Sequence, residues 1–311
     1  MRVTANTFPN SLLGQLSTLA TRQNRLQNQA ATGQRVQLPE DDPAAMRRTL
    51  DLQTEARSID QYKKNISSLR ESAQATYQVV KGLKTISDRA SELATQADGT
   101  KSPEQLKTYA VEVTQLIKQA VQLSNTKFGG DHLLSGTRSD QVPFVLTTDA
   151  NGNVTGVTYQ GNEAVAESEV ADGATLSAQT LGANSGGTGP RGLITDPRFG
   201  ADFFNHLIAL QDNLISGDTA AIATTTRPQL AKDEDNLILH LGINATVQAR
   251  LEAMRSLSDH QTDSLKVRIS GEVDADLAQT LVQLGQTQTA YQAALQSGAK
   301  ILDQSLLDYI R

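Results

Sequence analysis

Apolar and small residues recur at alternating steps of four and three through the stretch 274–310. Such steps align side chains in one stripe along a helix, as in a coiled coil. No charged residue occurs between Asp276 and Lys300. Because a solvated helix normally carries charges on its outer face, this pattern predicts a long helix that contacts uncharged neighbours on several sides. The stripe comprises Leu277, Leu281, Leu284, Gln288, Tyr291, Leu295, Gly298, Leu302, Ser305 and Tyr309.

A second stripe with the same spacing lies near the start of the sequence, and the chain carries no charge between Arg2 and Arg22. Two uncharged stripes far apart in one sequence predict that the two helices pair. The residues between these helices would then form the remaining domains. This second stripe comprises Leu12, Leu16, Leu19, Gln23, Leu26, Ala30 and Gly33.

Helical spacing returns from Pro43 to Ala97, this time with charged residues on one side. Asp42 before Pro43 is typical of an N-cap followed by proline in the first helical turn. Ser102 begins another helical pattern that runs to Leu123. The two patterns predict an antiparallel helical hairpin.

After residue 136 the spacing of apolar residues changes from that of helices to that of strands. Residues 143–148 and 154–159 are β-like runs joined by the turn-forming cluster 149–153, which predicts a hairpin. Weaker strand candidates lie at 167–170 and 175–180. We therefore interpret residues 137–200 as a small β-rich insertion.

Helical patterns resume at 202–216 and 219–232, where Pro228 predicts a break. Next, alternate residues are apolar, which favours a strand; these residues are Leu237, Leu239, Leu241 and Ile243. A long helix is predicted from about Thr246, with Gly271 as the joint before the last helix.

These elements predict a mainly α fold with a β-rich insertion, in which a long antiparallel helical bundle pairs its N- and C-terminal helices. Three domains are expected. The first joins 1–40 with 274–311, the second joins 41–136 with 201–273, and the third is the outer insertion 137–200.

Composition narrows the function. Aromatic residues make up 4% of the chain and tryptophan is absent, which favours long helices over an aromatic-rich pocket. The formal charge of -6 comes without a long single-sign run, so the electrostatic signature of a nucleic-acid or membrane-surface protein is missing. The chain has no cysteine, no apolar run of membrane-spanning length and no apolar core of a secretory signal. Composition alone thus indicates a cytoplasmic protein.

No motif predicts catalysis, a cofactor or a bound metal. The four histidines, His132, His206, His240 and His260, lack metal-ligand spacing. The glycines of 187–192 match a dinucleotide fingerprint, but no strand precedes them and Pro190 interrupts them, so a flexible loop is favoured.

Three residues of the turn, Asp149, Asn151 and Asn153, imitate the first ligands of a calcium loop. Val154 and Gln160 stand where that loop needs glycine and glutamate, so a plain β-turn is favoured.

Six further segments carry a family resemblance. They are Met1-Arg2-Val3-Thr4, Gly33-Gln34-Arg35-Val36, Pro39-Glu40-Asp41-Asp42-Pro43-Ala44-Ala45, the run 128–137 continuing to Pro143-Phe144, Tyr291-Gln292-Ala293-Ala294-Leu295 and Leu306-Leu307-Asp308-Tyr309-Ile310-Arg311. These segments resemble the flagellin superfamily, and within it the type 3 flagellar hook-associated proteins that form the hook-filament junction. The Asp-Asp-Pro form and the Gly-Thr-Arg to Pro-Phe segment favour this branch over filament flagellin.

The resemblance implies a structural protein, not an enzyme. It would be exported unfolded through the flagellar apparatus without a cleaved signal and would assemble as a ring at the distal hook, which replaces the cytoplasmic expectation. Its partners would be further copies of itself, a neighbouring hook-associated protein, flagellin and an export chaperone, with no nucleic acid and no membrane insertion.

On this view the leucines and tyrosines of both stripes form the seam between subunits, and residues 1–40 and 274–311 are expected to be mobile before assembly. Two alternatives remain at this point. One is filament flagellin itself, and the other is an enzyme carried in the insertion 137–200.

Overall fold

The computed structural model describes residues 7–309, and among them the side chains of residues 11–300. Contacts divide the chain into two compact units. Unit 1 consists of residues 1–58 and 260–311, and unit 2 consists of residues 59–259. The two longest helices, α2 (Pro43–Gln96) and α6 (Arg227–Val273), contribute residues to both units. The three-domain division expected from the sequence remains a prediction.

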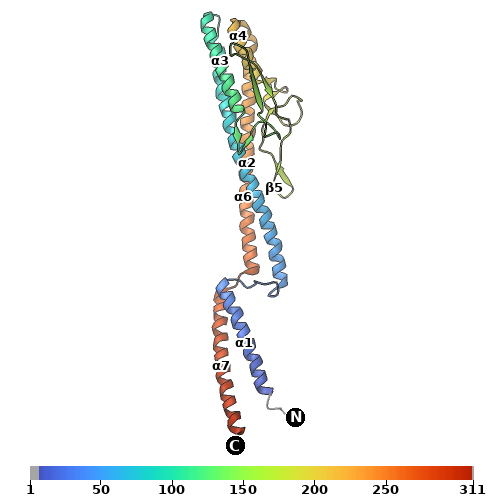
Figure 1. The fold of residues 1–311 in the computed structure, drawn as a ribbon, viewed down its shortest axis with the longest axis vertical. Helices are drawn as coiled ribbons and strands as arrows, with labels where there is room; N and C mark the ends of the chain where they lie inside the picture. Colours follow the sequence, from blue (N-terminus) through green and yellow to red (C-terminus); the bar gives the residue numbers. More distant parts are fainter. Residues whose placement is uncertain (1–6, 310–311) are drawn as a thin grey trace. The chain divides into compact units, whose positions relative to one another are not determined.

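Unit 1 contains the two terminal helices, α1 (Thr7–Thr32) and α7 (Leu277–Tyr309), which lie side by side (Figure 1). The pair is antiparallel, because Leu12 of α1 lies against Gly298 of α7 while Leu26 and Gln283 line one groove further along. The predicted pairing of the first and last helices is therefore present. The fold class, mainly helical with a small β-rich insertion, is confirmed.

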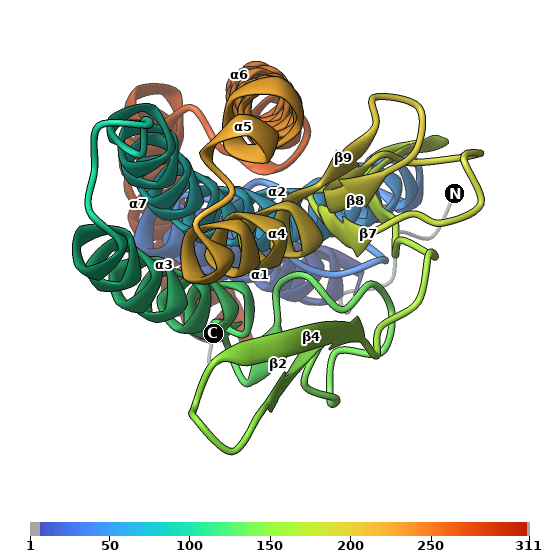
Figure 2. The ribbon, with the colours of Figure 1, turned by 90° about the horizontal axis from the view of Figure 1, so that it is seen from above.

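Unit 2 is a helical bundle that holds the strands. Its further helices are α3 (Pro103–Ser124), α4 (Phe203–Ser216), the short α5 (Thr219–Ala221) and a π-helix, η1 (Ile222–Thr226), that leads into α6. Seen end-on in Figure 2, α4 lies between α3 and the strands β7, β8 and β9. Ser102 caps α3 in a capping box with Gln105, as its sequence predicts.

The strands form four small sheets. Antiparallel pairs join β1 (Lys127–Phe128) to β2 (Asp131–His132), β3 (Phe144–Thr148) to β4 (Val154–Tyr159), and β5 (Ser168–Ala171) to β6 (Ala174–Leu176). In the fourth sheet, β8 (Gly192–Asp196) pairs in parallel with β7 (Leu181–Ala183) and antiparallel with β9 (Ala201–Asp202).

The main core of unit 2 lies where the bundle meets the strands. Phe144 of β3 packs edge-on against Phe204 of α4, with ring centroids 5.2 Å apart. The buried Gln211 of α4 accepts a hydrogen bond from the Thr114 hydroxyl and both accepts from and donates to the backbone of Val154. The side-chain amide of Asn125 likewise bonds the backbone N–H and C=O of Phe144. These amides fix the β3–β4 hairpin to the helices.

The strand predicted from alternating apolar residues at 237–243 is wrong, since these residues belong to α6. The same helix begins at Arg227 and not near Thr246, and it continues past Gly271 to Val273. Pro228 does not break the helix as predicted: helical backbone continues from α5 through the π-helix η1 into α6, and Pro228 directly follows that π-helical turn. The spacing of apolar residues misleads here because polar residues share the core-facing side of α6 with Leu230 and Leu237: Asn236 and His240 are buried and bind the carbonyl of Gly192.

Candidate assembly site on the terminal helices

The inner face of α1 carries the leucines predicted from the second stripe, the one near the start of the sequence. Leu12, Leu16 and Leu19 are half-buried, and Leu26 is buried. Steps of four and three keep these side chains on one side of the helix, toward α7. No charged residue interrupts this face, so the contact with α7 needs no ion pair.

The side of α7 that faces α1 is built from small residues. Thr280, Thr287 and Gly298 are buried, and Leu284 and Tyr291 beside them are half-buried. The Thr287 hydroxyl donates to the carbonyl of Gln283 at 2.7 Å, so its burial leaves no unpaired donor. Small residues at these positions let the two helices approach closely.

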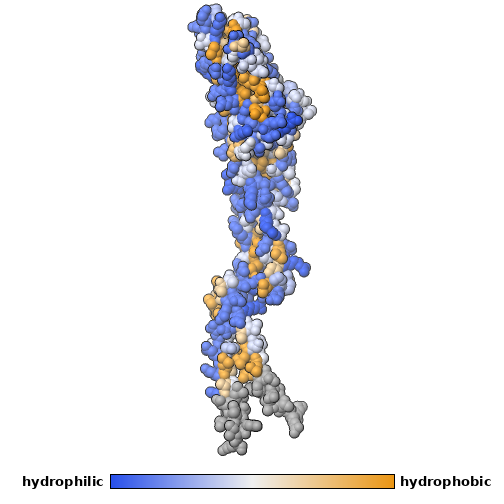
Figure 3. Space-filling view, viewed as in Figure 1, coloured by the Kyte–Doolittle hydropathy of each residue, from blue (hydrophilic) through white to orange (hydrophobic). Residues whose placement is uncertain are grey.

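Three leucines of the first stripe, on α7, remain uncovered. Leu277, Leu281 and Leu295 are 48%, 58% and 46% exposed. At 100° per residue they fall on one side of α7, within about 40° of each other, next to the edge that α1 covers. We call these three residues the leucine stripe. Figure 3 shows apolar surface in this helix pair, close to the grey atoms.

The leucine stripe can stabilise a contact with another molecule. Complete burial of a leucine side chain contributes about 1.5–3 kcal/mol. Because each of these side chains is already about half covered, closing the rest would contribute roughly 1 kcal/mol per residue. Leu302 and Tyr309, the last two members of the predicted seam, have side chains outside the described residues.

A hydrogen-bonded corner joins the terminal pair to the long helices within unit 1. The backbone N–H of Ala275 donates to the carbonyl of Gly33 at 2.8 Å, and that of Arg35 donates to the carbonyl of Val273 at 2.6 Å. Gly33 has φ of 73°, a conformation that favours glycine at the end of a helix. The motif beginning at Gly33 thus forms the turn after α1 and binds the start of the turn before α7.

Ion pairs hold the same corner. Arg48 forms two hydrogen bonds to the Glu272 carboxylate, at 2.9 and 2.7 Å. The Arg35 guanidinium donates to the Glu272 carbonyl at 2.8 Å and pairs with Asp42 at 3.3 Å. Hydrogen bonds of this bidentate kind fix orientation as well as distance. The corner therefore determines where α7 begins relative to α1 and the start of α2.

The acidic residues of this corner bind the backbone as carboxylates. Asp42 accepts from the N–H of Ala45 and so caps α2, as predicted, which lowers the pKa of Asp42. Asp41 accepts from the N–H groups of Leu38 and Gln37, and these bonds lower its pKa too. The pKa of Glu272 is lowered by its hydrogen bonds to Arg48. Sequence reasoning found the cap but not the Glu272 contacts, because partners so far apart in sequence leave no local signal.

Three of the four histidines, and Asp149 of the turn, make contacts within the fold. His132 bonds the carbonyl of Asn125, His206 bonds Asp233 at 2.7 Å, and His240 bonds Gly192. Within the described part of the chain, no group of three or more metal-ligating side chains converges. Asp149 accepts from the N–H groups of Asn151 and Asn153, which is the bonding of a turn, as predicted.

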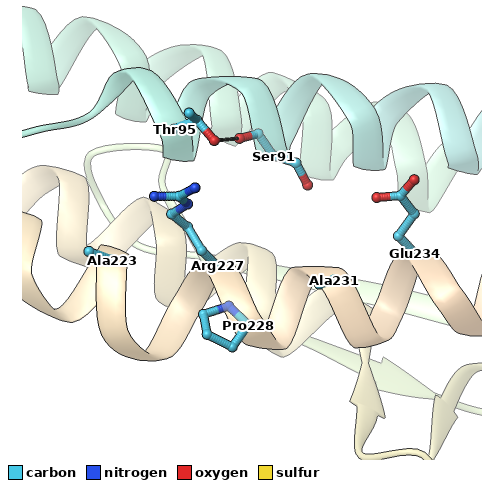
Figure 4. Close-up of a pocket in the computed structure, with 7 residues that line it drawn as sticks. All are labelled: Ser91, Thr95, Ala223, Arg227, Pro228, Ala231 and Glu234. Atoms are coloured by element: carbon cyan, nitrogen blue, oxygen red, sulfur yellow. Dashed lines mark hydrogen bonds between the residues drawn. The ribbon is translucent and has the colours of Figure 1, made fainter.

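One groove in unit 2 runs between α2 and the start of α6 and has a volume of about 490 Å³. Figure 4 shows Arg227 extending toward Thr95 and Ser91, with Glu234 at the other end. Within the groove, the Thr95 hydroxyl donates to the Ser91 carbonyl at 2.8 Å.

Comparison with known proteins agrees with this architecture. Residues 4–139 match the model for the bacterial flagellin N-terminal helical region. A Vibrio parahaemolyticus protein assigned as flagellar hook-associated superposes with a TM-score of 0.62 at 17% identity, over 75% of this chain and 100% of that one. FlgL of Bacillus cereus superposes with a TM-score of 0.55 at 20% identity, over 71% of this chain and 99% of that one. The fold is flagellin-like.

The flagellar hook-associated protein-3 of Legionella pneumophila has the same flagellin-like fold, with a TM-score of 0.50 at 15% identity over 76% of this chain and 98% of that one. These likenesses confirm, for the fold, the resemblance that the sequence motifs indicate. No curated protein matches the chain in sequence. In the described residues, no helix combines the length and apolar character needed to cross a membrane.

Proposed function

We propose that this chain is a structural protein of the bacterial flagellum that joins the hook to the flagellin filament through packing of its terminal helices. The observation that carries the proposal is the leucine stripe. The α1–α7 pair covers one edge of α7 and leaves Leu277, Leu281 and Leu295 exposed on a helix that has no charged residue from Leu277 to Ala299. An apolar, uncharged helix face suits burial against the helices of neighbouring subunits.

The proposed partners follow from this surface. Further copies of the chain would form a ring, in which each leucine stripe packs against a terminal helix of the next copy. One side of the ring would contact a neighbouring hook-associated protein and the other would contact flagellin. The chain would act outside the cell, at the hook-filament junction, after export with the help of a chaperone, and it would have no catalytic role.

A second candidate function is the filament subunit itself. The match of residues 4–139 to the flagellin N-terminal region favours it, because that region occurs in the bulk polymer subunit as well. The two functions differ in one property. A filament subunit adds to its own assemblies without limit, whereas a junction protein stops after a short ring.

Seeded elongation distinguishes them. Purified protein is mixed with fragments of its own assemblies and, separately, with isolated hooks, and both samples are examined by electron microscopy. The junction function predicts that long filaments do not form and that hook ends capture the protein and then accept flagellin. Filaments that grow without limit would establish the second candidate, and failure of hook ends to bind the protein would refute the junction function.

A further inference from the structure

The β5–β6 hairpin stands apart from the other strands of unit 2. Its two strands pair only with each other. The hairpin reverses at Asp172-Gly173, where Gly173 has φ of 65°. In Figure 1, β5 lies beside α2 and α6. The hairpin forms no strand pair with the sheet of β7, β8 and β9. A two-stranded hairpin is marginally stable alone, so this one depends on the helices beneath it.

One side chain anchors the hairpin. Val170 is fully buried and packs with Ile66 of α2 and Leu251 of α6, which are also fully buried. Partly buried apolar residues surround these three: Leu69, Ala174, Leu176, Val247 and Met254. This cluster is separate from the main core of unit 2.

Polar contacts align the hairpin on α2. The side-chain amide of Asn65 donates to the carbonyl of Glu169 at 2.8 Å, and the Tyr62 hydroxyl bonds the Glu169 carboxylate at 3.4 Å. At the base of the hairpin, the Gln179 side chain accepts from the N–H of Ala166 at 2.7 Å and so joins the two arms.

All the residues of this apolar cluster come from α2, α6 and the β5–β6 hairpin. The main core begins at Val79 on α2, where α3 and α4 join the bundle. Around Ile66, the pair α2 and α6 is joined at its sides by Arg70–Glu252 and Lys63–Asp259. Exposed ion pairs contribute little to stability. The hairpin therefore supplies the third side of a small core that would otherwise face water.

We propose that the β5–β6 hairpin is a strap that opens independently of the rest of unit 2. When closed, it fixes α2 against α6 around Ile66 and Leu251. When open, it exposes this apolar site and frees the helix pair to move there. Opening separates one fully buried side chain and a few hydrogen bonds, so it costs much less than unfolding of the unit.

Hydrogen exchange tests the proposal in the full-length protein. Val170→Asp places a charge in the anchor site, while Val145→Asp makes the same change on β3 at a residue that is 45% exposed. For Val170→Asp we expect exchange at least tenfold faster in residues 59–77 and 244–259, with unchanged exchange in α3 and α4. We expect no change in either region for Val145→Asp. Unchanged exchange around Ile66 and Leu251 in Val170→Asp would overturn the proposal.

A reversible lock covers the case in which Val170→Asp unfolds the whole unit. The chain has no cysteine, so Asn65→Cys with Glu169→Cys introduces the only thiols. Oxidation should give a monomeric disulfide and slow exchange in the same two stretches relative to the reduced protein. Equal exchange in the oxidised and reduced forms would show that strap opening does not control this part of the helix pair.

Discussion

Leu12 of α1 lies directly over Gly298 of α7. A Cβ on residue 298 would stand 2.5 Å from Cδ2 of Leu12, closer than side chains pack. Glycine costs a helix about 1 kcal/mol relative to alanine. At residue 298 the absence of a side chain lets the two helices approach closely, at the end of the pair farthest from the corner at Gly33.

Substitution of Gly298 should loosen this contact. For Gly298→Leu we expect the amides of residues 11–19 to exchange at least tenfold faster, because the added side chain must displace Leu12. Gly285→Leu is the matched control, since a Cβ at residue 285 meets nothing within 4 Å. It should leave exchange unchanged or slow it by raising helix propensity. Equal effects of the two substitutions would contradict the proposed packing.

Charges on the terminal helices should block assembly by two distinct routes. Leu281→Glu changes a member of the leucine stripe, so we expect the α1–α7 pair to persist while incorporation at hook ends is lost. Leu16→Glu and Leu284→Glu change half-buried positions, so the pair itself should also weaken. Unit 2 should remain folded in all three variants, as measured by circular dichroism.

The control for these charges is Val111→Glu, which makes a similar change at an exposed residue of α3. Incorporation is scored by electron microscopy of hook ends. Normal incorporation of Leu281→Glu would exclude the leucine stripe from the subunit contact, and loss of incorporation by Val111→Glu would show that the charge acts without regard to position.

Acid should weaken the corner in unit 1. The folded-state pKa values of Asp41, Asp42 and Glu272 lie below their ordinary values of 3.8, 3.8 and 4.5. Their stabilising contribution is therefore complete above the unfolded pKa values and is lost as the pH falls through the lower, folded ones. Between neutral pH and about pH 5 we expect no loss from these groups.

The variant carrying Asp41→Asn, Asp42→Asn and Glu272→Gln isolates this contribution from that of other carboxylates. Its melting temperature should be below that of the parent at pH 7, and the gap should narrow as the pH falls below about 4. A gap that stays constant down to pH 2.5 would show that these carboxylates do not stabilise the folded state through their charge.

The buried Gln211 should be important for the stability of unit 2. Gln211→Leu leaves the backbone N–H of Val154 and the Thr114 hydroxyl without this partner. We expect a loss of about 2–3 kcal/mol in the free energy of unfolding. Gln115→Leu, at an exposed position of α3, is the control and should change stability by less than about 0.5 kcal/mol. Urea unfolding followed by circular dichroism measures both, and equal losses would refute a specific role for Gln211.

Much of the fold could be predicted because its signals are local. Asp42 and Ser102 start helices through side chains that bond residues three positions ahead. The turn at Asp149 closes within five residues of its own sequence. The error in α6 arose where tertiary contacts replace local ones, since Asn236 and His240 lie on the core-facing side and bind the start of β8, which is distant in sequence. Because these buried residues are polar, a hydropathy pattern assigns their positions to the exposed side of the helix. The alternating apolar residues of 237–243 then have the spacing of a strand.

The terminal site could be predicted only in part. Spacing identified the leucines of α7 as one stripe, but it could not show which edge α1 would cover. In the structure Thr280, Thr287 and Gly298 face the partner helix, and the larger Leu277, Leu281 and Leu295 stay outside. The small side chains at these three positions permit the close approach of α1, and Leu284 and Tyr291 pack beside them.

The Asn125 side chain has a consequence beyond the stability of unit 2. Its amide occupies the N–H and C=O groups of Phe144 on the side of β3 that faces away from β4. An open strand edge invites a strand from another molecule, and crowded copies of a hairpin would otherwise be prone to sheet extension and aggregation. At this residue the side-chain amide takes the place of that foreign strand. The hairpin can thus be held at high local concentration with this part of its edge closed.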